Sequence, residues 1–469
     1  MILPFGLLLA AIALGPLLFP KWWLEHYSKV AIVLGAITFG YYLFGFHGDA
    51  RSAAHHKILE TGHEYVSFIA LIGSLFVVSG GIHINVKGEA SPIANVVFLL
   101  IGAMIANFIG TTGASMVLIR PWLRMNKYRV TAHHVVFFIF IVSNVGGCLT
   151  PIGDPPLFLG YLRGIPFWWV AEHCWPMWAV GIGMLLAMFY VVDVLNFRKA
   201  PKQIREKLTQ HEEWRFDGIA NVLFLAVIIG AVFIKNPLFL REALMVGAAV
   251  ASYFMTKKSI HHANNFNFHP IQEVAILFIG IFATMMPALD WLQANSRMLG
   301  TPSPSLYYWA CGSLSGFLDN APTYLSFLSA IEGTIDTSII AQIQHLISSN
   351  GADLAMLTGP NAEQIRATFS ALNQYFPSQL AAGKISAENI EIAFLLGNVA
   401  FNDFIVSISV AAVFFGAATY IGNGPNFMVK SIADHQKIHT PSFMGYIFKY
   451  SLPFLLPMLL VVWLIFFRN

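Results

Sequence analysis

Long apolar runs separated by short polar loops occupy most of the chain. A run of about 20 residues is what a helix needs to cross the ~30 Å hydrocarbon core of a membrane. The pattern predicts membrane-spanning helices at 2–19, 29–46, 63–83, 174–194, 217–234, 240–255, 272–290 and 444–466. No basic segment precedes the first run and no small-residue cleavage site follows it, so we expect a membrane helix there and not a signal peptide.

Two further apolar stretches, 92–122 and 303–330, are too long for one crossing and carry polar, Gly or Pro residues at their middles. Half of such a stretch is about 22 Å long at 1.5 Å per residue, enough to reach the midplane and return. Both therefore predict re-entrant helical hairpins. The alternative is a long tilted helix that tolerates its polar residues.

The stretches 132–170 and 392–430 are also too long, and each contains a segment that regular helix cannot accommodate. Residues 143–156 combine Gly146, Gly147 and Pro151 with a Pro155-Pro156 pair, and residues 416–426 are similarly rich in Gly. Since proline lacks a backbone donor and glycine weakens helices, we predict a helix broken at membrane depth in each.

The same pieces recur in the same order, which indicates a duplicated unit. A span, a hairpin and a broken helix follow Glu64 and again follow Glu273, and 153–158 matches 422–427. The second copy contains a polar insertion at 331–391, expected to be an extramembranous cap. The predicted domains are scaffold helices at 1–62, a first transport unit at 63–194, a cytoplasmic loop with scaffold helices at 195–271, and a second transport unit at 272–466.

Basic residues in two loops, 120–129 and 198–215, predict that both loops are cytoplasmic. The two hairpins then open toward opposite sides, so the repeats are inverted. Inverted repeats with broken helices at matching positions indicate a secondary transporter with its site near the midplane. The predicted fold is an all-α membrane protein of about 10 transmembrane helices, a multi-pass protein of the cell membrane.

Composition agrees with a protein in a lipid bilayer. Charged residues make up 11% of the 469 residues, against about 25% in a soluble domain, and mean hydropathy is +0.65. A net charge of +3 is too small to imply a nucleic-acid partner. Cys148, Cys174 and Cys311 lie in apolar surroundings without a paired spacing, which argues against disulfides and zinc sites.

An ion that crosses a bilayer needs fixed dipoles in place of its hydration shell, and short amides, hydroxyls, carboxylates and open carbonyls supply them. The hairpin middles and helix breaks concentrate such groups. The expected ion- or substrate-binding residues are Asn107, Thr111, Thr112, Ser143, Asn144, Thr150, Gly153, Asp154, Asp319, Asn320, Thr323, Asp403, Thr419, Gly422, Asn423 and Asn426. Within this set, sodium is expected at Asn107, Asn144, Asp154, Asp319, Asn320 and Asn423. No organic cofactor is expected.

The carboxylates have competing interpretations. Asp154 either binds a cation or proton, or caps the second half of its broken helix. Asp319 could equally cap the return helix of its hairpin, and Asp403 could be buried in the core. Glu64 and Glu273 are interpreted as favouring the N-termini of their helices.

The histidine pairs at 55–56, 133–134 and 261–262 have no carboxylate at metal-ligand spacing, which predicts solvated faces. Enzymatic chemistry is also disfavoured. Pro151 stands where the Gly-x-Gly-Asp run of intramembrane aspartyl proteases needs its first glycine. His63-Glu64 is not followed by the second histidine of a zinc protease motif.

Residues 107–114, 146–156 and 319–322 resemble motifs of the ion transporter superfamily. That group includes D-type sodium/proton antiporters, arsenite permeases, citrate transporters and divalent anion/sodium symporters. The resemblance implies two inverted repeats, a scaffold that forms a homodimer, and a transport domain that moves as an elevator. It also implies sodium sites where each hairpin tip meets its broken helix.

The hairpin tips differ from the Ser-Asn-Thr tips in which dicarboxylate symporters resemble one another. Asp154 and Asp319 at opposite tips could compete for a proton or a metal cation, so the first expectation is sodium/proton antiport. The alternative is a sodium- or proton-coupled transporter of citrate-like or other organic anions, with a carboxylate binding the coupling cation.

Overall fold

The protein is mostly helical, as shown by a computed structural model that describes residues 1–86, 90–199, 215–234, 236–296, 302–348, 357–383 and 385–468. Seven helical segments in these residues are long and apolar enough to cross a membrane, so the chain is a multi-pass membrane protein. They are α2 (Pro20–Phe44), α3 (Asp49–Gly80), α4 (Pro92–Met125), α7 (Phe167–Lys199), α12 (His269–Asn295), α19 with η3 (Val399–Ala418), and α21 to α22 (Phe443–Phe466).

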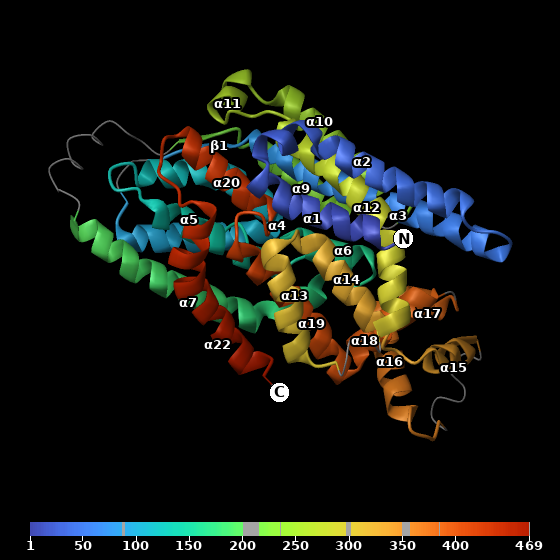
Figure 1. The fold of residues 1–469 in the computed structure, drawn as a ribbon. Coiled ribbons are helices and arrows are strands. Elements are labelled where there is room, and N and C mark those ends of the chain that lie inside the picture. The colour runs from blue at the N-terminus through green and yellow to red at the C-terminus, as the bar shows by residue number, and fades with distance from the viewer. Residues whose placement is uncertain are drawn as a thin grey trace.

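One group of helices forms a layer at the upper right of Figure 1. It contains α2, α3 and α12 together with α1 (Leu3–Leu18), α9 (Asn221–Val232) and α10 (Leu240–Met255). Helices α2 and α12 cross closely, and glycine at position 280 permits this. A Cβ there would come within 2.7 Å of the Ala31 carbonyl. Residues 63–83 and 272–290, assigned from sequence to the transport units, thus pack among the expected scaffold helices.

Glu64 does not begin its helix, as the sequence interpretation held. Helix α3 begins at Asp49, and Glu64 lies buried in its interior. The polar segment before the apolar run continues the helix because it contains neither proline nor a capping break.

Helix α4 turns back on itself at Gly110, where φ is 75°. Asn95 and Asn126, near its two ends, exchange amide hydrogen bonds of 2.8 and 3.0 Å. The rings of Phe98 and Trp122 lie 5.5 Å apart. A straight helix would hold Asn95 and Asn126 roughly 45 Å apart and Phe98 and Trp122 roughly 36 Å apart, so the chain folds into two packed helical segments joined at Gly110.

Helices α13 (Pro304–Phe317) and α14 (Asn320–Glu332) make a similar arrangement around Leu318 and Asp319. The rings of Tyr307 and Phe327 lie 6.2 Å apart, so the helices pack side by side. The Asp319 carboxylate accepts a 3.0 Å bond from the Ala321 backbone N–H and caps α14.

Two non-helical segments interrupt the remaining long apolar stretches. The first lies between α5 (Ala132–Ile141) and α6 (Pro155–Leu162) and includes the short helix η1 (Val145–Gly147). The second lies between η3 (Gly416–Ala418) and α20 (Gly424–His435). In the second stretch, residues 392–397 end α18 (Ala387–Gly397), and α19 proper runs over Val399–Phe415.

The described residues of the insertion are mostly helical, and part of α18 lies against the end of α6. They form α15 (Thr337–Ser348), α16 (Ala362–Tyr375), α17 (Pro377–Ala381) and the first five residues of α18. A Cβ on Gly164, just beyond α6, would lie 3.1 Å from Asn389 Oδ1 of α18. Burial raises the pKa of Glu388 in α18, and the nearby carboxylate of Glu60 raises it further.

The all-α expectation misses a small antiparallel sheet. Strands β1 (His83–Asn85) and β2 (Arg215–Asp217) pair next to α11 (Lys258–Ala263). Three-residue strands have too little alternation to be recognised in a sequence.

Gly110→Ala should destabilise the protein by about 1–3 kcal/mol, because φ 75° with ψ 155° is open essentially to glycine alone. The added Cβ would also press to 3.2 Å against the Ile152 carbonyl. Thermal unfolding of the detergent-purified protein measures this. Gly230→Ala is the matched control, since its Cβ meets nothing and alanine favours helix α9. Equal melting temperatures for the two variants would contradict the expectation.

Candidate functional site

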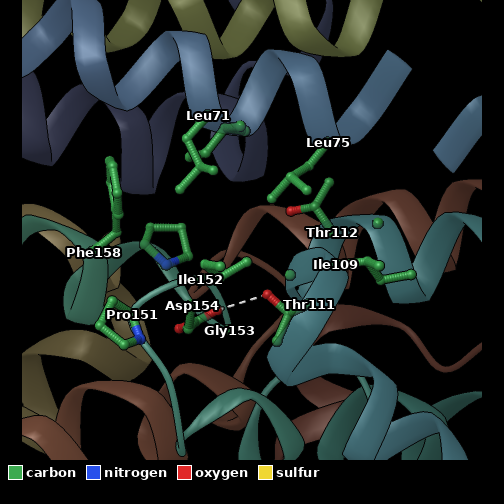
Figure 2. Close-up of a pocket in the computed structure, with 14 residues that line it drawn as sticks. Leu71, Leu75, Ile109, Thr111, Thr112, Pro151, Ile152, Gly153, Asp154 and Phe158 are labelled. Carbon is green, nitrogen blue, oxygen red and sulfur yellow. Dashed lines mark hydrogen bonds between the residues drawn. The ribbon is translucent and has the colours of Figure 1, made fainter. Parts of the chain in front are cut away.

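The carboxylate of Asp154 lies where two helix–turn–helix hairpins, α4 around Gly110 and α13–α14 around Asp319, meet the two non-helical segments, or breaks, that precede α6 and α20. It receives hydrogen bonds from Thr111 Oγ1 at 2.7 Å, Asn320 Nδ2 at 2.6 Å and Asn423 Nδ2 at 2.9 Å. The side chain is 1% exposed. Although Asp154 occupies the N-cap position of α6, its side chain makes no capping bond. The capping interpretation is therefore wrong, and Asp154 faces Thr111 in Figure 2.

A chain of buried amides extends from Asp154 through the two breaks. Asn423 Nδ2 also donates to Asn144 Oδ1 at 3.1 Å, and Asn144 Nδ2 donates to Asn426 Oδ1 at 2.6 Å. Asn426 in turn donates to the carbonyls of Gly416 and Thr419 at 2.7 and 2.8 Å. These side chains satisfy backbone groups that the missing helix leaves open.

Each break is fastened to its own hairpin by a threonine. Thr150 Oγ1 donates to the Asn107 carbonyl at 2.5 Å and accepts from Gly153 N–H at 3.1 Å. Thr419 Oγ1 donates to the Gly316 carbonyl at 2.7 Å and accepts from Gly422 N–H at 3.2 Å. The same pair of contacts thus occurs twice.

Glycine is required at one position in each break, Gly153 and Gly422, because another stretch of backbone lies too close for a side chain. A Cβ on Gly153 would overlap the Gly147 carbonyl, and one on Gly422 would come within 2.6 Å of the Gly416 carbonyl. The backbone of each break therefore crosses itself too closely for any side chain.

Asn107 and Ser143 support the first break. Asn107 Nδ2 donates to the Gly146 carbonyl at 2.7 Å, and its Oδ1 accepts from Leu149 N–H at 2.9 Å. Ser143 shares a 2.7 Å hydroxyl contact with Ser115 of α4. All of these groups are bonded to protein atoms, which indicates a positioning role.

A cavity of about 20 Å³ adjoins Asp154 on the α3 side of the first hairpin tip. Leu71 and Leu75 of α3 close it opposite Gly153 (Figure 2). Thr112 lines the cavity on the side facing Leu75, whereas Thr111 faces Asp154. About 10–15 Å³ accommodates one water molecule. The space therefore fits one water or a small cation and is too small for a tricarboxylate.

The negative charge of Asp154 lies near the N-termini of several helices. Helices α6, α14 and α20 and the second segment of α4 all begin beside it, at Pro155, Asn320, Gly424 and Thr111. Their N-termini favour negative charge. Asn320 Oδ1 is buried without a hydrogen-bond partner in the described residues, which leaves one acceptor beside the carboxylate. No basic side chain described by the structure hydrogen-bonds Asp154.

Four of the expected site residues lie outside the bonded cluster, and one of them, Thr112, lines the cavity. Asp319 caps α14 and Thr323 Oγ1 bonds the Asp319 carbonyl at 2.9 Å, so neither side chain hydrogen-bonds Asp154. Asp403 is exposed in the first turns of α19, so the alternative in which it is buried in the core is wrong. It occupies the outward face of the helix end that lies far from the break.

A second buried carboxylate, Asp193 of α7, was not anticipated. Arg129 bonds both its oxygens, and His133 Nε2 and His134 Nε2 lie 3.4 and 3.1 Å from Oδ1. The solvated-face prediction for this histidine pair is therefore wrong. The three possible ligand atoms lie within 4.8 Å of one another, but the Arg129 guanidinium already bonds both oxygens of the Asp193 carboxylate. A lone aspartate in the apolar run 174–194 was the available signal.

Glu64 is a further carboxylate whose position differs from the interpretation of the sequence. Its Oε1 pairs with Arg163 Nε at 2.9 Å, which joins α3 to the end of α6. The negative charges of Asp193 and Glu64 are thus each compensated by an arginine.

The comparisons with known proteins place this arrangement in a family. A family model described as "Putative citrate transport" matches residues 1–467. The chain belongs to this family. The family is part of the ion transporter superfamily, so the resemblance seen in the sequence motifs is confirmed. No curated protein matches the chain.

Membership of a transporter family also confirms that the chain is not an enzyme. Of the two functional expectations, the family description favours the citrate-like anion over sodium/proton exchange.

Thr150→Val and Thr419→Val should each destabilise the protein by about 1–3 kcal/mol, because each removes the hydroxyl donor of a carbonyl in a buried segment, that of Asn107 or that of Gly316. The melting temperature of the purified protein is the readout. Thr284→Val is the matched control, since Thr284 is buried but bonds only its own helix at Gly280. A loss no greater than that of Thr284→Val would show that the threonines do not hold the breaks.

Proposed function

We propose that the chain is a cation-coupled secondary transporter of citrate-like organic anions, in which Asp154 binds the coupling cation. The observation that carries the proposal is the single buried carboxylate held by three neutral donors from both halves of the chain. A buried charge without a counter-charge is costly, and binding of a sodium ion or a proton removes that cost. The family match supplies the anion class.

Two features support cation coupling at this point. The cavity beside Asp154 is of a size for one small ion, and the unpaired Asn320 Oδ1 provides a second oxygen ligand. Oxygen ligands of this kind are those that sodium sites in transporters use. In this proposal the converging helix N-termini favour the anion once the site opens.

Sodium/proton exchange is the second candidate, and one observation favours it. The single carboxylate of Asp154 is bonded from both hairpins. A proton on this carboxylate would exclude a cation, and a cation would exclude the proton. The competition between Asp154 and Asp319 is not needed for this alternative, because the Asp319 carboxylate caps α14.

The proposed mechanism is an elevator movement of a transport unit built from two inverted repeats. Support comes from the paired contacts of Thr150 and Thr419 and from the two helical turns at Gly110 and Asp319. The unit comprises α4–α7, α13, α14 and α19–α22, and it moves against the layer that contains α2 and α12 in Figure 1. The homodimer implied by the resemblance belongs to the same proposal.

Asp154→Asn should lower cation-driven citrate uptake roughly 10- to 100-fold, the range expected for loss of a charged contact worth ~1.5–3 kcal/mol. The amide retains the size of the side chain but cannot bind a proton or balance a cation. Uptake of labelled citrate into proteoliposomes, driven by a sodium or a proton gradient, measures it. Asp49→Asn, an exposed change in the first turn of α3, is the control.

The same vesicles separate the two candidates. Citrate uptake that needs an inward sodium or proton gradient supports the proposal. A sodium-driven pH change without any organic anion, and without citrate uptake, supports exchange instead. Normal citrate coupling in Asp154→Asn would remove the assigned cation site.

Inverted repeats require the two hairpins to open toward opposite faces of the membrane. Single cysteines at Lys127, beyond the open end of α4, and at Ser338, beyond α14, should react with a membrane-impermeant thiol reagent from opposite sides. The background replaces Cys148, Cys174 and Cys311, all of which are buried. Labelling of both positions from one side would contradict the inverted topology.

A further inference from the structure

A second and much larger cavity lies away from Asp154, at the opposite end of the second segment of α4. Its volume is about 390 Å³, within the ~300–1,000 Å³ range of small-molecule pockets. Strand β1, the end of α11 and the residues after α20 form its other walls, and these elements lie close together in Figure 1. About nine residues of helix, roughly 13 Å, separate Arg120 in this lining from Thr111 beside Asp154. The cavity is therefore separate from the cation and anion positions proposed at the centre.

The charged groups of the lining are all basic. Arg120, Arg124 and Lys127 line the cavity, and none of its described lining residues is acidic. Arg120 and Arg124 are about one helical turn apart in α4, so both face the cavity from the same side of the helix. Arg124 Nη1 is oriented by a 2.6 Å bond to Asn85 Oδ1. A concave lining with charge of one sign concentrates anionic groups.

Arg120 is the residue of this lining whose hydrogen bonding is incomplete. Its Nη1 is buried and meets no hydrogen-bond acceptor in the part of the chain the structure describes. Burying an unpaired guanidinium N–H is costly. An oxyanion supplies the acceptor, and the planar guanidinium matches two oxygens of a phosphate group.

The place of the cavity along α4 indicates where such an oxyanion comes from. Helix α4 ends at Met125, and the basic loop 120–129 is predicted to be cytoplasmic. The lining therefore lies at the depth of the lipid headgroups, where anionic lipids make the membrane surface negative. Apolar side chains complete the lining, and they can pack against the glycerol and upper acyl carbons of a lipid, whereas a hydrated inorganic ion gains nothing from them. These side chains are Ile84, Pro121, Leu123, Val130 and Ile438.

We propose that this basic cavity binds the phosphodiester headgroup of an anionic lipid, with Arg120 as its principal phosphate-binding residue. Arg124 and Lys127 add positive charge around the phosphate, and the apolar lining contacts the glycerol backbone. The inference goes beyond the proposed function, because a lipid held here stays in the membrane and is not the transported anion.

A headgroup in this cavity would contact two groups of helices. Arg120 and Gln436 belong to the proposed moving unit, whereas β1 is tied to the layer that contains α3. Asn264, which ends α11, donates to the Gly80 carbonyl at 2.9 Å, and its Oδ1 lies 2.7 Å from His83 Nδ1 of β1. The bound lipid therefore favours the present arrangement of the two groups over one in which the proposed moving unit has shifted.

Native mass spectrometry of the protein titrated with phosphatidylglycerol tests the site. Arg120→Gln should weaken binding of this lipid roughly tenfold or more, as loss of a charged bidentate contact does. Arg120→Lys should retain part of the affinity, since lysine keeps the charge but not the planar pair of donors. Arg198→Gln removes the same charge from an exposed position outside the cavity and should leave binding unchanged. Equal lipid affinity in the wild type and Arg120→Gln would overturn the assignment.

Lys127→Gln keeps the test decisive if Arg120→Gln fails to fold. Lys127 is exposed and lines the same cavity, so its replacement leaves the packed core intact. Loss of one basic group near an anionic headgroup should weaken phosphatidylglycerol binding roughly fivefold. Where Arg120→Gln does not fold, unchanged lipid affinity in Lys127→Gln overturns the site.

Two further ligands identify the source of the phosphate. Phosphatidylcholine carries the same phosphodiester without net charge and should bind more weakly than phosphatidylglycerol, so equal binding of the two lipids would overturn the assignment. Inorganic phosphate is the soluble alternative. Thermal stabilisation by inorganic phosphate that is lost in Arg120→Gln, together with displacement of phosphatidylglycerol by it, would replace the lipid with a soluble ion. Because lipid binding is measured without transport, its failure leaves the proposed function standing, and a failure of citrate uptake leaves the lipid site standing.

Discussion

Burial of the Asp154 carboxylate is the constraint on which the centre of this structure depends. A carboxylate removed from water is costly unless its oxygens are bonded. Here the bonds come from Thr111, Asn320 and Asn423, which lie on three separate segments. Both hairpin tips and both helix breaks must therefore come together before the charge is tolerated, and any change in that charge acts on all four at once.

The unwound backbone beside Asp154 is stable because side chains replace the missing helical bonds. Thr150 and Thr419 fasten the breaks to the hairpins, and Asn144 and Asn426 join one break to the other. Amides and hydroxyls do this without adding charge. Asp154 consequently remains the single negative group of the bonded cluster, which is the ground for the cation position proposed there.

Arginines accompany the carboxylates at the periphery and are absent from the bonded centre. Asp193 is bonded by Arg129, and Glu64 is paired with Arg163. Separating the two partners of such a pair would leave a buried charge uncompensated, so the pair keeps its helices together. Arg120 reverses the pattern, since there the arginine is the group whose Nη1 lacks an acceptor. The described carboxylates at the edges are thus paired with arginine, whereas the central carboxylate of Asp154 is bonded by neutral groups alone.

The sequence by itself determined the membrane class, the places where helices break and most of the polar groups that meet there. These follow from local properties: apolar length, the missing N–H of proline and the conformational freedom of glycine, as at Gly110. Only the tertiary structure decided which acid faces the centre. Asp154 and Asp319 both occupy N-cap positions, yet only Asp319 caps its helix, because Thr111, Asn320 and Asn423 reach Asp154 from distant parts of the chain. The burial of His134 and Glu64 was decided in the same way, since a partner that lies far along the chain leaves no local pattern.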